Sequence, residues 1–346
     1  MTKENSLRID FLKFVCAILV VTMHCKCPGG YIQELLVDGV ATIAVPFFFL
    51  CSGYFLAKHL DTWPSWWSAL RKRIRTLIVP YFIWSWLFAI LIIAVAFSID
   101  FCLGQHLGTT PFTDGQGVGL SRILKLAGLW KTPPLYQLWY IRCLFAFVAL
   151  SPLIVFMLKK FGRAWLALCF LSTILIAILP NETVKRVLRL VFSIGGLFYF
   201  SLGIYLFKKN ITLPCMGRVS FLIGGGVIIA LALLLAKVYF ALNGNSLLNG
   251  LLGEFSILFM ICATWFLTPP QRLPSWLVNT SFPIFIFHLF FIQPFVDCFK
   301  YCSLLRDSPW MKSLIYFLAG VVGSILLAHA LRRFFPRFAR VAFGER

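Results

Sequence analysis

Long apolar runs separated by short polar connections make up most of the chain. Each run is about 17 to 25 residues long, the length of a helix that crosses a bilayer core. Strands of a membrane barrel would instead give short segments of alternating polarity. The pattern predicts an all-α, polytopic transmembrane bundle of about ten spans. We place them near residues 9–25, 37–57, 77–97, 138–158, 164–180, 189–207, 219–241, 247–267, 280–297 and 313–331.

The composition leads to the same class of protein. Hydrophobic residues make up 60% of the 346 residues, charged residues only 13%, and the mean hydropathy is +0.88. This is too little polar surface to cover a soluble fold of that length. We expect residues 1–346 to form a single membrane domain with no separate soluble domain.

The net charge of +20 is distributed unevenly along the chain. With the N-terminus inside, 19 of the 32 Lys and Arg residues fall in the termini and the even-numbered connections, 11 fall on the other side, and Lys13 and Arg142 fall within spans. This asymmetry follows the positive-inside rule, so we expect both termini in the cytoplasm. The basic charge then reflects topology among membrane lipids, and we expect no nucleic-acid partner.

Two ionisable residues mark the first span. His24 ends it, and Lys13 precedes His24 by eleven residues. Eleven residues are almost three helical turns, so the two side chains share one helix face roughly 16 Å apart. Ionisable groups at membrane depth are costly, which favours an intramembrane functional site. The alternative is a lysine that extends to the interface together with an interfacial histidine.

A basic run precedes the third span. We expect residues 58–76 to form a cytoplasmic loop that ends with Arg71, Lys72, Arg73 and Arg75. Such a run can anchor a helix to anionic headgroups. It can also bind the phosphates of a nucleotide-bearing donor such as coenzyme A, because arginine pairs with phosphate in a bidentate manner. The run alone does not distinguish these two roles.

Three further features carry weaker signals. The segment 98–137 is long and rich in glycine, which indicates an outer loop that acts either as a lid or as a spacer. The run 224–226 consists of three glycines inside a span and indicates close helix packing. The eleven cysteines lie mostly in apolar runs, so we expect no metal site and no required disulfide, although Cys25 with Cys27 or Cys298 with Cys302 could oxidise.

Several stretches together resemble one known family. The chain is similar to the bacterial acyltransferase 3 family of integral membrane O-acyltransferases, and the matching stretches follow the family's order through most of the chain. They are residues 9–13 leading to 20–24, residues 45–56, the basic run before Pro80 and Tyr81, residues 138–141 and residues 281–288. Each stretch is short, but five in sequence make chance similarity improbable.

The resemblance implies transfer of an acyl group, commonly acetyl from acetyl-CoA, to a hydroxyl of a carbohydrate or cell-envelope glycan. It places the protein in the bacterial inner membrane as a multi-pass enzyme, with acyl-CoA as donor substrate and no bound cofactor. His24 occupies the position of the family's catalytic histidine. Lys13 stands where the family usually has an arginine, so the charge is kept but the planar fork is lost. The spacing of Arg71, Arg73 and Arg75 departs from the family's basic motif and leaves the corresponding residue open.

The chemistry of such a transfer assigns a role to His24 and requires a partner for it. A neutral imidazole is suited to remove the proton of a sugar hydroxyl as it attacks a thioester, which makes His24 the general base. The oxyanion needs a donor. The candidate donors are Ser52, Tyr54, Trp139 and Arg142.

Three other ionisable residues fall within spans. His288 either lines the cavity or hydrogen-bonds a neighbouring helix, and Lys237 and Glu254 are further candidates for polar sites. A polytopic transporter or lipid-linked glycan flippase is the competing class. Transporters often show internal repeats with interrupted helices, and this chain shows none. The sequence specifies neither the accepting glycan nor an oligomeric state.

Overall fold

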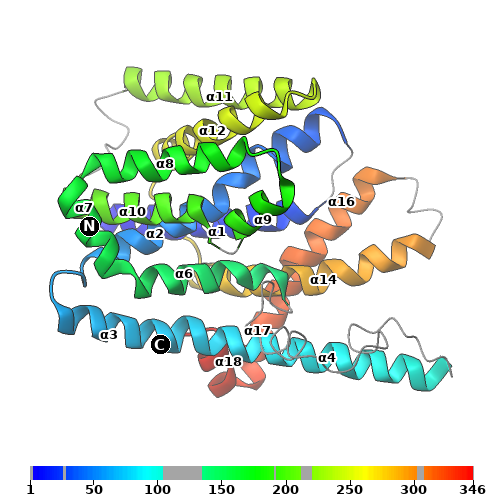
Figure 1. The fold of residues 1–346 in the computed structure, drawn as a ribbon. Helices are drawn as coiled ribbons and strands as arrows, with labels where there is room; N and C mark the ends of the chain where they lie inside the picture. Colours follow the sequence, from blue (N-terminus) through cyan, green and yellow to red (C-terminus); the bar gives the residue numbers. More distant parts are fainter. Residues whose placement is uncertain are drawn as a thin grey trace.

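The computed structural model describes residues 3–25, 29–103, 135–190, 192–211, 220–301 and 308–345. Every regular element within these ranges is helical, which confirms the all-α prediction (Figure 1). The principal helices are α1 (Lys3–His24), α2 (Ala44–Ala57), α3 (Trp63–Arg73), α4 (Val79–Leu103), α6 (Trp139–Ala149), α7 (Ser151–Phe161), α8 (Arg163–Ala177), α9 (Glu182–Leu190), α10 (Ile194–Lys208), α11 (Ser220–Leu242), α12 (Ser246–Leu267), α13 (Ser275–Val278), α14 (Ser281–Tyr301), α16 (Pro309–Leu318), α17 (Ser324–Phe334) and α18 (Pro336–Ala342). Short 3-10 or π-helical turns join or extend them: η1 (Gln33–Val37), η2 (Val40–Ile43), η3 (Ile74–Ile78), η4 (Tyr136–Leu138) and η5 (Ala319–Gly323).

Several continuous helices have the length and composition of membrane spans. Among the described residues, four qualify: Gln33–His59, Trp63–Leu91, Leu247–Leu267 and Pro309–Phe334. The pair Tyr136–Ala149 and Ser151–Phe161 makes a fifth if the two bent halves form one span. Shorter apolar helices cover Arg163–Ala177, Ile194–Lys208, Gly226–Leu242 and Ser281–Phe295. The count of ten spans and the placement of both termini in the cytoplasm stay predictions.

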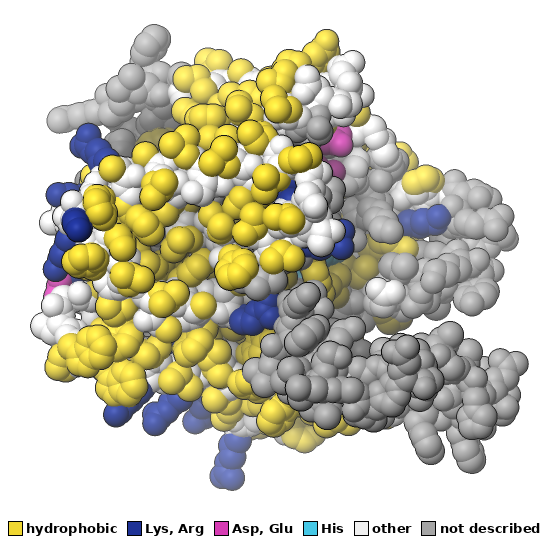
Figure 2. All heavy atoms as spheres, in the orientation of Figure 1, with side chains coloured by type: hydrophobic (Ala, Val, Ile, Leu, Met, Phe, Trp, Pro, Cys, Tyr) yellow, Lys and Arg dark blue, Asp and Glu magenta, His cyan; other side chains and the backbone are white. Residues whose placement is uncertain are grey.

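Hydrophobic side chains cover the outside of the bundle as well as its core. Figure 2 shows them across most of the visible face. On α8, for example, Leu168, Leu171 and Leu175 are each more than half exposed. Apolar surface that extends over whole helices is typical of contact with lipid.

The fourth predicted span is not one straight helix. The axes of its two halves differ by 61° at Leu150, so the segment predicted as a span over 138–158 is sharply bent. The cause is Pro152, which has no N–H for the Val148 carbonyl four residues earlier. That carbonyl instead accepts hydrogen bonds from Ser151 Oγ at 2.7 Å and from the Trp66 indole at 3.3 Å. A side chain of α3 therefore replaces part of the hydrogen bonding that the Val148 carbonyl loses at the bend.

The basic run lies on a helix, which corrects the predicted loop over 58–76. Helix α3 begins at Trp63, includes Arg73 and continues through η3 into α4. Pro64 in the first turn starts this helix, and the buried Trp66, Ala69 and Leu70 give it one apolar side. Figure 1 shows α3 and α4 as one long rod along an edge of the bundle. The arginines are thus held at fixed helical positions.

The predicted outer loop is shorter than expected at its start. Helix α4 extends to Leu103, so residues 98–103 are helical. Residues 104–134 lie outside the described ranges, as do Cys27 and Cys302, so the lid, the spacer and the cysteine pairings stay predictions.

Two glycines allow α2 and α10 to pack with their backbones in contact. A Cβ added at Gly53 of α2 would fall on the Phe200 carbonyl of α10, and one added at Gly203 would fall on the Leu50 carbonyl of α2. This reciprocal contact is the small-residue packing typical of membrane helices.

The glycine run in α11 behaves differently. No described atom lies within 4 Å of a Cβ added at Gly224 or Gly226. The described residues therefore do not show the close helix packing predicted at these two positions.

Basic side chains gather at one end of the bundle. Figure 2 shows Lys and Arg mainly along the left and lower edges, where Figure 1 places the N-terminus and the start of α3. At this end Lys208 donates to Asp61 at 2.5 Å. That hydrogen bond lowers the pKa of the Asp61 carboxyl. His24 ends α1, so the length of that helix separates it from the N-terminus at this end of the bundle.

Candidate functional site

Two imidazoles meet inside the bundle. The rings of His24 on α1 and His288 on α14 have centroids 5.0 Å apart and planes tilted by 35°. His288 is fully buried, with 0% of its surface exposed, whereas His24 is half-buried. The sequence left two roles open for His288, lining a cavity or hydrogen-bonding a neighbouring helix. The structure places its ring beside the ring of His24.

The hydrogen bond of His288 fixes which nitrogen carries its proton. Nδ1 lies 3.0 Å from the Ile284 carbonyl on the same helix. A carbonyl only accepts, so Nδ1 donates and Nε2 of the neutral ring holds a lone pair. Nε2 points away from the α14 backbone and has no hydrogen-bond partner among the described residues. The pair therefore contains a buried acceptor next to a second imidazole.

Gln137 fixes the helix that carries His288. Its side-chain amide is 3% exposed and donates to the Ile286 carbonyl at 2.5 Å. Because Ile286 is two residues before His288, this bond ties η4 to the turn that positions the imidazole. The sequence interpretation missed Gln137; its signal was an uncharged polar residue directly before an apolar span. Trp139, one of the predicted oxyanion donors, follows two residues later and is half-buried.

A second polar group lies between α2 and α6. The buried Tyr140 packs edge-on against Phe49 with centroids 4.7 Å apart, and its hydroxyl shares a hydrogen bond with Ser52. The charge of Arg73 also acts on this hydroxyl. Ser52 is therefore engaged with Tyr140, in a group that contains no histidine.

The three arginines of the basic run have different surroundings. Arg73 is half-buried, and its charge acts on the Tyr140 hydroxyl. Arg71 is exposed and lies over the Trp67 ring, 5.2 Å from its centroid, and Arg75 is also exposed. Arg73 is thus the member placed to act inside the bundle.

Lys13 lies on α1 about three helical turns before His24. It forms an ion pair of 3.5 Å with Asp10 and lies 4.8 Å from the centre of the Phe55 ring. At 1.5 Å per residue this level is about 16 Å from His24. Tyr54, beside Phe55, packs against Phe207 with ring centroids 5.3 Å apart. The structure does not bring Tyr54 to His24.

Arg142 is half-buried on α6 and acts electrostatically on Tyr81 of α4. Its role at an oxyanion stays a prediction. Among the described residues, no group of three or more His, Cys, Asp or Glu is arranged to hold a metal ion.

Comparison with known proteins adds independent evidence. The family model of an acyltransferase domain, Acyl_transf_3, matches residues 6–329. The chain is also 24% identical over 313 residues to the succinoglycan biosynthesis protein ExoH of Rhizobium meliloti (strain 1021), covering 83% of this chain and 80% of the relative. No solved structure matches the chain.

Proposed function

The chain belongs to the acyltransferase 3 family, and from this membership we propose that it is an O-acyltransferase of the bacterial inner membrane that modifies a cell-envelope polysaccharide. The donor in this proposal is acyl-CoA, most simply acetyl-CoA. The similarity to a succinoglycan biosynthesis protein supports a polysaccharide as the acceptor class. The observation that carries the proposal is the pair formed by His24 and His288 inside the bundle.

The pair can perform the proton transfers of such a reaction. The centroid separation of 5.0 Å lets a small rotation bring an N–H of His24 to Nε2 of His288. The other nitrogen of His24 then holds a lone pair for the acceptor hydroxyl. As that oxygen attacks the thioester carbonyl, His24 takes its proton; when the carbon–sulfur bond breaks, His24 returns the proton to the departing coenzyme A sulfur.

The positions of the basic residues suggest the donor route. We place the end bearing α3 in the cytoplasm, where its half-buried Arg73 binds a phosphate of coenzyme A. The pantetheine arm then extends along the side of α1 that carries Lys13, about 16 Å from His24. The acceptor approaches His24 from the other end. Only the acyl group needs to pass between the two sides.

Replacing Arg73 with Gln should raise the apparent KM for acetyl-CoA by about tenfold or more, because a hydrogen bond to a charged group contributes about 1.5–3 kcal/mol. Arg71→Gln is the matched control and should change this KM little, since Arg71 is exposed over Trp67. Steady-state transfer by each variant in lipid nanodiscs measures the effect. Equal KM values for wild type and both variants would identify the run as a headgroup anchor.

Replacing His288 with Asn should lower kcat by up to about a hundredfold through mispositioning of His24, with the KM for acetyl-CoA unchanged. Asparagine can still donate to the Ile284 carbonyl but lacks an acceptor at the position of Nε2. Glutamine reaches that position, so His288→Gln should retain more activity. In the Asn variant the acid limb of the pH–rate profile should move to lower pH, because the protonated His24 loses its acceptor. Equal losses in both variants with an unmoved profile would mean that His288 only packs.

The function itself is tested with purified protein in nanodiscs, supplied with radiolabelled acetyl-CoA or succinyl-CoA. The acceptor is envelope polysaccharide from the source bacterium, freed of esters by mild alkali. We expect label on the polysaccharide as an alkali-labile ester. Movement of glycan across vesicles containing the protein, without label transfer from either donor, would instead establish the transporter class.

A further inference from the structure

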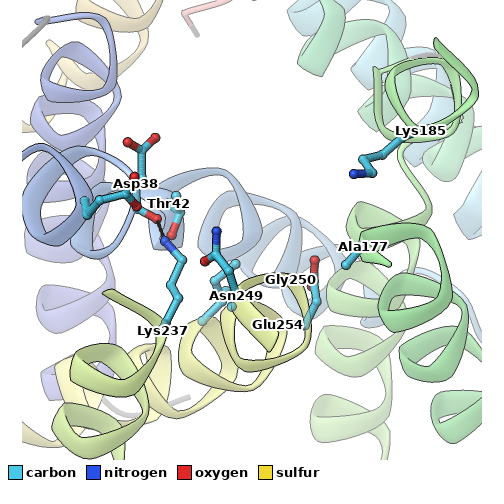
Figure 3. Close-up of a pocket in the computed structure, with 11 residues that line it drawn as sticks. Asp38, Thr42, Ala177, Lys185, Lys237, Asn249, Gly250 and Glu254 are labelled. Atoms are coloured by element: carbon cyan, nitrogen blue, oxygen red, sulfur yellow. Dashed lines mark hydrogen bonds between the residues drawn. The ribbon is translucent and has the colours of Figure 1, made fainter. Parts of the chain in front are cut away.

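A cavity of about 610 Å³ lies apart from the histidine pair. Figure 3 shows Asp38 and Thr42 on one side, Asn249, Gly250 and Glu254 of α12 forming the floor, and Lys185 of α9 extending from the opposite side. Glu34 of η1 and Lys237 of α11 complete the polar lining. Its volume falls within the range of small-molecule sites, about 300–1,000 Å³. The sequence singled out Lys237 and Glu254 as isolated ionisable residues, and the structure brings them into one cavity.

The cavity wall is held in place by a buried amine. Lys237 is 8% exposed and donates to the backbone carbonyl of Asp38, as the dashed line in Figure 3 marks. The charges of Glu34 and Asp38 act on this ammonium. The buried ammonium charge of Lys237 is therefore compensated by its hydrogen bond and by the nearby carboxylates. Lys237 therefore fixes η1 and η2 against α11, so that the cavity keeps its shape.

The remaining polar atoms include many acceptors and few donors. The side-chain oxygen of Asn249 is buried and has no hydrogen-bond partner within the described ranges. Thr42 donates its hydroxyl proton to Gly39 at 2.5 Å, so its oxygen is left to accept. Glu34, Asp38 and Glu254 add carboxylates, and Lys185 adds an ammonium from the opposite side.

This lining selects among ligand classes by its chemistry. An anion would meet three carboxylates and a cation would meet two ammonium groups. A neutral ligand rich in hydroxyl groups can donate to the carboxylates and accept from the lysines, because each hydroxyl does both. The described carboxylates also do not converge with other ligands into a metal-binding group.

The cavity and His24 lie at the same end of the bundle. Turn η1 begins nine residues after His24, and η2 packs against both α1 and α12. We propose that this cavity binds a sugar unit of the acceptor glycan next to the unit that is acylated, an inference that rests on the proposed function. The cavity then sets acceptor specificity, whereas the histidine pair performs the transfer.

The first test removes a charge without changing size. Glu254→Gln should raise the KM for ester-free envelope polysaccharide by about tenfold, the loss expected for a hydrogen bond to a charged group. The KM for acetyl-CoA should not change. Glu4→Gln is the matched control, because Glu4 is exposed at the start of α1, away from the cavity.

The second test fills the cavity. Gly253 lies in its floor, and a Cβ added there would make only ordinary contact with Lys237 Cε at 3.6 Å. Gly253→Leu should therefore keep the fold but raise the polysaccharide KM beyond that of Glu254→Gln. Gly226→Leu makes the same change on α11, where no described atom lies within 4 Å of the added Cβ, and should leave this KM unaltered.

Measuring both substrates separates the two proposals. Unchanged polysaccharide KM values in Glu254→Gln and Gly253→Leu, in a wild-type enzyme that does transfer label, would overturn the acceptor site and leave the acyltransferase proposal standing. A wild-type protein that transfers no label from acetyl-CoA or succinyl-CoA would overturn both. If Gly253→Leu fails to assemble, Glu254→Gln alone decides, since it preserves the volume of the side chain.

Discussion

Replacing His24 with Gln should lower kcat for acyl transfer by about a hundredfold to ten-thousandfold, the usual contribution of a general base. Glutamine is polar and close in length, but its amide does not take up a proton at neutral pH. The acceptor hydroxyl must then lose its proton without assistance. Binding of acetyl-CoA should be unaffected, because in this proposal Arg73 and the side of α1 near Lys13 hold the donor, and Lys13 lies about 16 Å from His24 along the helix.

The control for this substitution is another histidine of the same kind. His329 on α17 donates from Nδ1 to the Ile325 carbonyl at 2.8 Å, as His288 does to Ile284, but its ring packs against Trp276. His329→Gln should retain wild-type transfer. The measurement is the initial rate of label transfer at saturating donor and polysaccharide. Transfer at the wild-type rate by His24→Gln would remove His24 from the mechanism.

The position of His24 at the end of an apolar helix could be predicted from the sequence, but its contact with His288 could not. An imidazole at the end of an apolar run is a local feature that a single chain displays directly. The approach of His288 depends on how α14 packs against α1, which brings together residues from opposite ends of the chain. Its hydrogen bond to Ile284 and the contact of Gln137 with Ile286 also arise only in the packed bundle.

The basic run shows a different limit. Four cations in five residues suit a solvated loop, so periodicity gave little weight to a helix there. The buried Trp66 and Leu70 one turn earlier give α3 its apolar side, and burial against the bundle decides between loop and helix. The cavity could not be predicted from the sequence either, because Glu34, Lys185 and Glu254 come from distant segments of the chain.

Replacing Gly53 with Ala should cost stability in the upper part of the about 1–3 kcal/mol range for overpacking, or prevent assembly. The added methyl would fall on the Phe200 carbonyl, which belongs to the α10 backbone and cannot rotate away as a side chain would. Helix propensity alone predicts the opposite sign, since Ala is favoured over Gly by about 1 kcal/mol within a helix. The outcome therefore shows which term dominates at this position.

Gly226→Ala separates the two terms, because no described atom lies within 4 Å of its added Cβ. Helix propensity acts there alone, so this variant should be as stable as the wild type or slightly more stable.

Gly203→Ala should destabilise the protein as Gly53→Ala does, since its methyl would meet the Leu50 carbonyl across the same contact. Once one substitution has separated α2 from α10, the second should cost less, and the double variant should be less destabilised than additivity predicts. Thermal unfolding in nanodiscs, followed by tryptophan fluorescence, measures the wild type and all four variants. A Gly53→Ala variant as stable as Gly226→Ala would mean that backbone contact between α2 and α10 does not hold the bundle together.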